Sequence, residues 1–110
     1  MKIVSWNCRG LGNRTAVRGL LELQKSENPD MVFLSETGLI KSKLEKFRWM
    51  LGLPNLLARD WDETGGRGMA LFWRSDVDVV LHDYSRYHID VEVTESSGFV
   101  GLVIHSVNCN

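Results

Sequence analysis

Two apolar segments near the start of the chain each end in a polar residue. Residues 2–7 (KIVSWN) end in Asn7, and residues 31–36 (MVFLSE) end in Glu36. Short apolar runs that are rich in β-branched and aromatic residues, and that are followed by turn residues, are typical of strands covered on both faces. The pattern therefore predicts two buried strands, each of which places a polar side chain at or just beyond its carboxyl end.

The residues between these two strands predict an amphipathic helix. Asn13 is suited to the N-cap, because its side-chain oxygen can accept a hydrogen bond from the first turn. The helix should end before Asn28 and Pro29, since the residue before a proline avoids the helical conformation. Strand, helix and strand in this order are the elements of a parallel pair with a right-handed crossover. The apolar face of the helix would consist of Ala16, Leu20, Leu21 and Leu23.

The rest of the chain predicts one more helix and five more strands. Ser42 is a candidate N-cap for a helix over residues 42–51, and Gly52 lies just past its end. Strands are expected over residues 55–59, 69–73, 77–84, 88–93 and 99–104, with a polar, glycine-rich hairpin connection over residues 60–68. The second helix has a basic face, which is either a solvated surface or a surface that contacts a DNA backbone. This face consists of Lys41, Lys43, Lys46 and Arg48.

Length and composition indicate one compact domain that is neither secreted nor bound to a membrane. The chain has 110 residues, of which 44% are hydrophobic and 25% charged. Its net charge of −1 gives no broad basic surface, so any nucleic-acid activity must depend on a local site. No apolar run approaches the ~20 residues that span a bilayer, and a secretory signal is lacking. Cys8 and Cys109 are too far apart for a C-x-x-C motif, so we expect free thiols in a reducing, intracellular compartment.

Asn7 and Glu36 are the candidate site. Ligands of open sheets bind near the carboxyl ends of strands. If the two strands are neighbours, Asn7 and Glu36 would lie side by side, with oxygens suited to a hard cation such as Mg²⁺. The alternative is structural, because a Glu just past a strand is commonly solvated and an Asn there commonly makes a local turn hydrogen bond. Residues 9–12 (RGLG) are interpreted first as a tight turn, from which Arg9 could reach a phosphate.

Two other groups of polar residues contain the residue types of a catalytic or metal site but lack the sequence spacing that such a site requires. Ser85, His88 and Asp90 are the residue types of a hydrolase triad, but no nucleophile-elbow sequence surrounds Ser85. His82, His88 and His105 lack the spacing of zinc ligands. We therefore expect neither a triad nor a zinc site in this chain.

Three segments carry a resemblance to a known family. They are SWNCRGLGN (Ser5 to Asn13), PDMVFLSET (Pro29 to Thr37) and GGRGMALFW (Gly65 to Trp73), and they occur in this order. With them the chain resembles the amino-terminal half of the endonuclease/exonuclease/phosphatase family, from about Lys2 to about Val93. Within that family it looks most like the endonuclease domain of plant LINE-type (non-LTR) retrotransposons.

The resemblance implies a fold and a chemistry. The expected class is α/β (α+β), with one mixed β-sheet and two helices that form half of a four-layer α/β-sandwich, and with residues 1–110 as a partial domain. The implied activity is hydrolysis of phosphodiesters by a DNA endonuclease that depends on Mg²⁺ or Mn²⁺. Asn7 and Glu36 match the family's catalytic and metal-binding Asn and Glu. DNA would be the partner, and the nucleus the expected location.

The sequence also departs from the family. Ser35 stands where the family often has Gln, and the family's later Tyr, Asp-x-Asn motif and Asp-His pair have no convincing counterpart. The expectation is therefore a truncated domain that is inactive alone. Two alternatives stay open, the phosphatase branch of the same family and a non-catalytic interaction module. The module would self-associate through an uncovered sheet face formed by Ile3, Val32, Leu34, Leu71 and Trp73.

Overall fold

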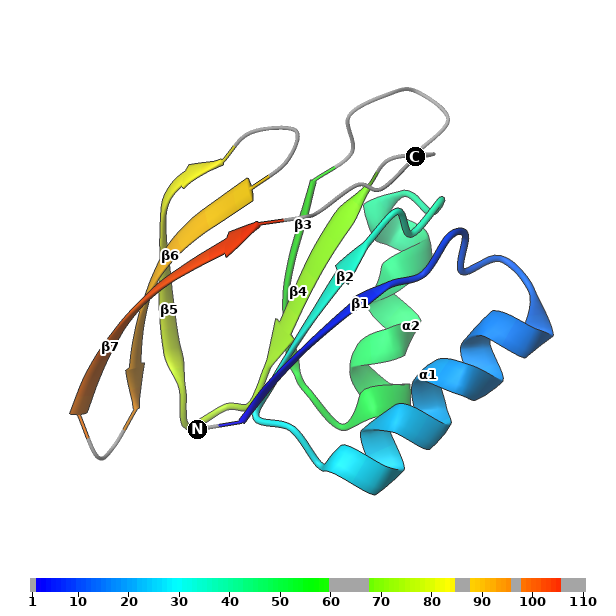
Figure 1. Ribbon diagram of the computed structural model, residues 1–110, viewed down its shortest axis with the longest axis horizontal. Helices are drawn as coiled ribbons and strands as arrows, with labels where there is room; N and C mark the ends of the chain where they lie inside the picture. The colour runs from blue at the N-terminus through cyan, green and yellow to red at the C-terminus, as the bar shows by residue number, and fades with distance from the viewer. Residues whose placement is uncertain (1, 60–67, 85–87, 96–97, 106–110) are drawn as a thin grey trace. The chain divides into compact units, whose positions relative to one another are not determined.

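The computed structural model describes residues 2–59, 68–84, 88–95 and 98–105 (Figure 1). Its internal contacts divide the chain into two compact units, Met1–Arg74 and Ser75–Asn110. The first unit contains β1 (Ile3–Asn7), α1 (Arg14–Glu27), β2 (Met31–Ser35), α2 (Lys41–Leu51), β3 (Asn55–Arg59) and β4 (Met69–Trp73). The second contains β5 (Asp78–Tyr84), β6 (His88–Glu95) and β7 (Gly98–His105).

The first unit is built on a mixed four-stranded sheet with the order β1-β2-β4-β3. β1 and β2 are parallel, in a register that pairs Ile3 with Met31 and Asn7 with Ser35. β4 lies between β2 and β3 and is antiparallel to both. The predicted parallel pair and the antiparallel pairing of residues 55–59 with 69–73 are therefore confirmed. The loop that joins β3 to β4 lies mostly outside the described residues.

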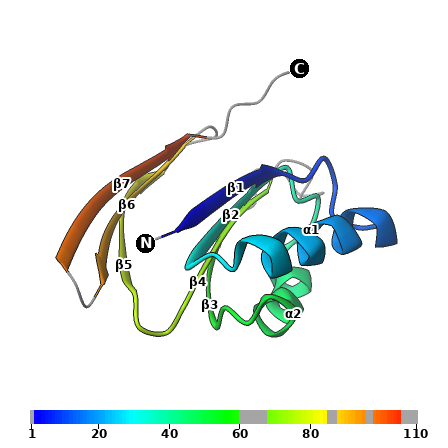
Figure 2. The ribbon, with the colours of Figure 1, turned by 60° about the horizontal axis from the view of Figure 1, so that its bottom comes forward.

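Both helices cover one face of this sheet (Figure 2). Side chains alternate along β2, so Val32 and Leu34 face the same side, and there they share a buried core with Leu20, Phe47 and Phe72. The expectation that Val32 and Leu34 would be left uncovered was therefore wrong, because their face of the strand is the one that the helices cover. Of the other residues in that expectation, Leu71 is buried, and Ile3 and Trp73 are half-buried.

Local capping accounts for the ends of the helices. Asn13 caps α1 as predicted, with its side-chain oxygen accepting a hydrogen bond from the Ala16 amide at 2.8 Å. α1 ends at the left-handed residue Asn28, just before Pro29. The N-cap prediction for α2 was wrong. The amides of Lys43 and Leu44 donate to the carbonyl of Ile40, so Ile40 is the N-cap and Ser42 lies inside the first turn.

The second unit is a three-stranded antiparallel sheet with the order β5-β6-β7. Along β6, Ile89, Val91 and Val93 are buried, and Asp90 and Glu92 between them are less buried, as the alternating sequence predicted. The mixed α/β class and the two-helix sheet are confirmed. The sequence prediction named only one sheet, and the structure adds this second one. Among the described residues, no helix combines the length and the apolar content that crossing a membrane would require.

Candidate functional site

Asn7 and Glu36 lie beside each other at the carboxyl edge of the parallel strands β1 and β2. Asn7 is the last residue of β1, and Glu36 directly follows Ser35, the residue of β2 that pairs with Asn7. Both side chains are half-buried, and the Asn7 amide Nδ2 donates a hydrogen bond to Glu36 Oε2. The structure thus brings together the two residues that the sequence predicted as neighbours.

Backbone hydrogen bonds hold the two loops that follow these strands against each other. The amides of Cys8, Gly10 and Leu11 donate to the carbonyls of Ser35, Glu36 and Thr37 at 2.9, 2.8 and 2.7 Å. These bonds continue the pairing of β1 and β2 beyond the ends of the strands. The positions of Asn7 and Glu36 are therefore set by paired backbone rather than by free loops.

Two residues at this edge have the left-handed backbone conformation that non-glycine residues rarely adopt. They are Glu36, with φ of 50°, and Arg9, with φ of 48°. Such a conformation costs about 1–2 kcal/mol for an L-residue with a Cβ atom. Strained backbone of this kind tends to cluster at functional sites, where the surrounding structure maintains it. At Glu36 the turn aims the carboxylate back toward Asn7 instead of continuing the strand direction.

The donor set at this edge fits a divalent cation that keeps several of its waters. Glu36 contributes a carboxylate, and Asn7 contributes Oδ1, which accepts a hydrogen bond from the Arg9 amide at 3.0 Å. A carboxamide oxygen has two lone pairs, so that bond leaves one available. Mg²⁺ commonly binds through one or two carboxylates together with water and substrate phosphates. Within the described part of the chain, no group of three His, Cys, Asp or Glu side chains forms a larger cluster of metal ligands.

Cys8 lies next to the site but is not suited to act as a ligand or nucleophile. Its side chain is buried, and it is a free thiol, as predicted. Burial, with a further contribution from the Glu36 charge, raises the pKa of the Cys8 thiol from 9.0 to about 12. The thiol therefore stays protonated at neutral pH, and only thiolates are effective ligands and nucleophiles. Cys109 lies outside the described residues.

The other sequence candidates have separate outcomes. Arg9 is exposed in the loop after β1, and no described residue pairs with its guanidinium. His82 Nε2 lies 2.7 Å from Glu92 Oε2, in an exposed cross-strand pair of the second unit. Ser85 lies outside the described residues, so the expectation that Ser85, His88 and Asp90 form no hydrolase triad is not tested.

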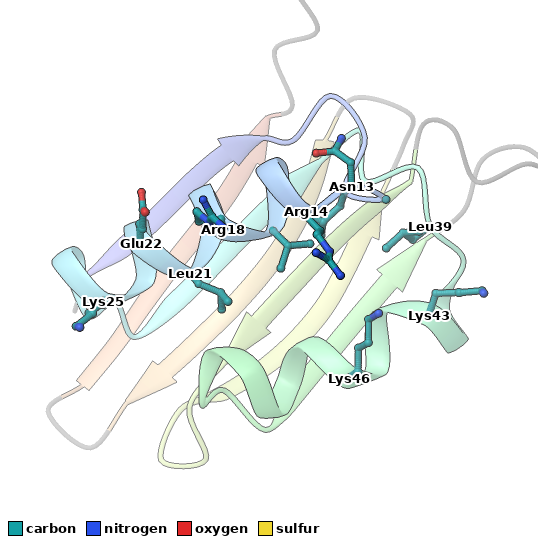
Figure 3. A pocket seen from close by; sticks show the side chains of 12 residues that line it. Asn13, Arg14, Arg18, Leu21, Glu22, Lys25, Leu39, Lys43 and Lys46 are labelled. Atoms are coloured by element: carbon teal, nitrogen blue, oxygen red, sulfur yellow. The ribbon is translucent and has the colours of Figure 1, made fainter.

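The predicted basic face of α2 is divided in the structure. Arg48 forms an ion pair with Glu45 at 2.8 Å and donates to the carbonyl of Pro54 at 3.1 Å. Lys43 and Lys46 instead line a groove between α1 and α2 (Figure 3). The groove was not predicted from the basic residues of α2, because its other wall comes from α1. The signal that could have found it is the spacing of Arg14, Arg18 and Lys25 along α1.

Comparison with known proteins gives a family and a fold. The sequence model of the endonuclease/exonuclease/phosphatase family matches residues 4–108. A search of curated protein sequences found no match. Among solved structures, truncated TDP2 of Caenorhabditis elegans has 22% sequence identity and a TM-score of 0.63, covering 97% of this chain and 46% of that chain. TDP2 from C. elegans has 22% identity and a TM-score of 0.49, covering 84% of this chain and 31% of that chain.

The structural matches and the family match support different conclusions. The chain spans less than half the length of both solved structures, and at this level of identity the likeness to truncated TDP2 establishes a shared fold. The family match supports a stronger conclusion, because it covers nearly the whole chain and both compact units. The chain therefore belongs to the endonuclease/exonuclease/phosphatase family.

Proposed function

We propose that this chain supplies the cation-binding and phosphate-binding side of a phosphodiester hydrolase, with Asn7 and Glu36 as its central residues. The observation that carries the proposal is the hydrogen bond from the Asn7 amide to the Glu36 carboxylate at the shared carboxyl edge of β1 and β2. A carboxylate and an amide oxygen held at that edge are donors of the kind that Mg²⁺ or Mn²⁺ prefers. Family membership supports the same reaction class.

Each residue has a separate part in this proposal. Glu36 would bind the cation through its carboxylate, and Asn7 would hold that carboxylate in place and offer Oδ1 as a second oxygen. Arg9, exposed in the loop after β1, would bind a phosphoryl oxygen of the substrate. The bound cation would neutralise the charge that develops on the phosphoryl oxygens during hydrolysis.

The finer form of the proposal is a DNA endonuclease of the type found in plant LINE-type retrotransposons. It is supported by the order of the segments SWNCRGLGN, PDMVFLSET and GGRGMALFW, the last of which lies partly outside the described residues. In this form DNA is the substrate and the nucleus is the location. The alternative within the family is a phosphatase, which the same residues could serve.

Cation binding is the sharpest test, because it does not require turnover. Mg²⁺ or Mn²⁺ is titrated into the chain by isothermal calorimetry, with the Glu36→Gln variant alongside. Glu36→Gln keeps the size of the side chain and removes its charge, so the affinity should fall about tenfold or more. The matched control is Glu22→Gln, which removes the same charge from an exposed position on α1 and should leave the affinity unchanged. Equal affinities for the wild type and Glu36→Gln would refute the cation role.

Substrate class is tested with a phosphodiester and a phosphomonoester. We expect the 110 residues alone to nick plasmid DNA poorly, since the sequence has no counterpart of the family's water-activating Asp-His pair and a general base is worth roughly 10²–10⁴ in rate. Residual turnover should favour bis-p-nitrophenyl phosphate and should be lost in Glu36→Gln. Cation-dependent turnover of p-nitrophenyl phosphate alone would instead support the phosphatase branch.

A further inference from the structure

A groove of about 700 Å³ runs between α1 and α2, away from the sheet (Figure 3). Two loops form one end of the groove. Leu11 and Asn13 come from the loop after β1, and Leu39 comes from the loop after β2. Its floor is aliphatic. Leu11 is buried, and Val17, Leu21 and Leu39 are half-buried and pack on the core beneath the helices. The groove therefore offers apolar surface that the chain itself covers only in part.

Basic side chains border this apolar floor on both sides. α1 contributes Arg14, Arg18 and Lys25, and α2 contributes Lys43 and Lys46. All five are exposed, and none of them forms an ion pair within the described part of the chain. Of the described residues that line the groove, only Glu22 is acidic. Figure 3 shows Arg14, Leu21 and Lys46 directed into the space between the two helices.

This combination of floor and border discriminates between kinds of ligand. A single strand of nucleic acid would use the cations, but none of the residues that line the groove in the described part of the chain is aromatic, so a base has no ring on which to stack. A double helix would contact the cations through its phosphates and would leave the aliphatic floor uncovered. An aliphatic floor instead favours a ligand that packs leucine-like side chains against it, because apolar surface is then removed from water. A ligand with apolar side chains on one face and carboxylates at its edges matches both features at once.

The length of the groove sets the size of that ligand. Arg14 and Lys25 are eleven residues apart on α1, which corresponds to ~16 Å, or about three helical turns. Arg14, Arg18 and Lys25 follow the i, i+4, i+11 spacing of one helix stripe, so the cations of α1 stay on one side along this whole length. A helix of about three turns therefore matches the length of the basic stripe along α1.

We propose that the groove between α1 and α2 is a docking site for an acidic amphipathic helix of a partner protein. Its apolar side chains would pack on Val17, Leu21 and Leu39, and its carboxylates would pair with Arg18 and Lys46 from opposite sides. This site is separate from Asn7 and Glu36, and the proposal does not depend on the function proposed for that pair.

The probe is a fluorescein-labelled peptide of about 15 residues, made of Leu and Glu with leucines at helical i, i+3, i+4 and i+7 positions. Binding to the full chain is measured by fluorescence anisotropy, beside a scrambled peptide of the same composition and a dT oligonucleotide of similar length. The patterned peptide should bind at least about tenfold more tightly than either comparison ligand. Equal binding of the scrambled peptide, tighter binding of the oligonucleotide, or no binding of the patterned peptide would overturn the proposal.

Charge reversal then locates the site. Arg18→Glu and Lys46→Glu should each weaken binding of the patterned peptide about tenfold. Lys41→Glu is the matched control, because Lys41 is an exposed lysine of α2 that does not line the groove. It should leave the affinity within about twofold of the wild type. A Lys41→Glu effect as large as that of Lys46→Glu would show nonspecific attraction and refute the site. Circular dichroism confirms that each variant is folded.

Discussion

The two compact units differ in charge as well as in architecture. Residues 1–74 contain twelve of the thirteen Lys and Arg but eight of the fourteen Asp and Glu, which gives this unit a net charge of +4. Residues 75–110 contain one Arg and six acidic residues, for a net charge of −5. The near-neutral total of −1 is thus the sum of two opposite and larger charges.

The comparison teaches that whole-chain charge is a poor guide to what one region can bind. The field at a binding site depends mainly on charges within about 10 Å of it, because more distant surface charges are screened at ordinary salt. Asn7, Glu36 and the groove between α1 and α2 all belong to the positive unit. The net charge of −1 for the whole chain therefore does not describe residues 1–74, whose own net charge is +4.

The largest expected effect concerns the core of the first unit. Phe47 of α2 is fully buried among the helices and the sheet. Phe47→Ala should lower the free energy of unfolding by about 3–5 kcal/mol, because it removes a large apolar side chain and leaves a cavity. Urea denaturation followed by circular dichroism measures the loss. Val80→Ala in the second unit is the control, since Val80 is 55% exposed and its truncation should change stability by no more than about 0.5 kcal/mol.

The next effect is the protection of the Cys8 thiol. With its pKa raised from 9.0 to about 12, the folded chain at pH 8 holds about a thousandfold less thiolate than the unfolded chain. In a Cys109→Ser background, reaction with DTNB at pH 8 should be correspondingly slow until urea is added. Comparable rates in the folded and unfolded chains would contradict the burial of this thiol.

The same shift predicts a loss of stability in alkali. The pKa of the Cys8 thiol is higher in the folded chain than in the unfolded chain, so the protonated thiol contributes to the free energy of unfolding. This contribution is fully present below about pH 9 and is lost as the pH rises from about 9 toward 12. Glu36→Gln removes the smaller, electrostatic cause and should lower the Cys8 pKa while leaving it raised by burial. Urea midpoints across this pH range, compared with those of a Cys8→Ser variant, measure the effect. A Cys8→Ser chain with an unchanged alkaline profile would assign the loss to other groups.

A smaller effect is expected at the N-cap of α1. Asn13→Ala removes the hydrogen bond that the side chain accepts from the Ala16 amide and should cost about 0.5–2 kcal/mol of unfolding free energy. Asn13→Ser is the matched control, because serine can accept the same bond and should retain most of the stability. If alanine and serine are equally destabilising, capping is not the reason for the loss.

The smallest effect is expected in the acidic second unit. His82 and Glu92 form an exposed cross-strand pair, and exposed pairs contribute about 0–1 kcal/mol. Glu92→Gln should therefore shift the urea midpoint by little at pH 7, and less at high salt. A loss larger than that of Asn13→Ala would show that the second unit depends on this pair far more than exposure allows.

Much of the first unit followed from local patterns. The strands that end at Asn7 and Ser35, the cap at Asn13 and the end of α1 before Pro29 were all predicted, because each depends on residues close together in sequence. The start of α2 was not. Ile40 has no capping side chain, so the helix begins where backbone hydrogen bonds to its carbonyl become possible.

Sequence periodicity by itself determined the strand and helix segments, and it placed Asn7 and Glu36 at the ends of two strands. Only the tertiary structure decided that Val32 and Leu34 face the helices, that Glu36 turns back toward Asn7, and that Arg18 and Lys46 border one groove. The physical reason is that local patterns record which residues share a face of one element. Which element that face meets depends on contacts between residues far apart in the chain, and a single sequence does not encode those pairings in any local signal.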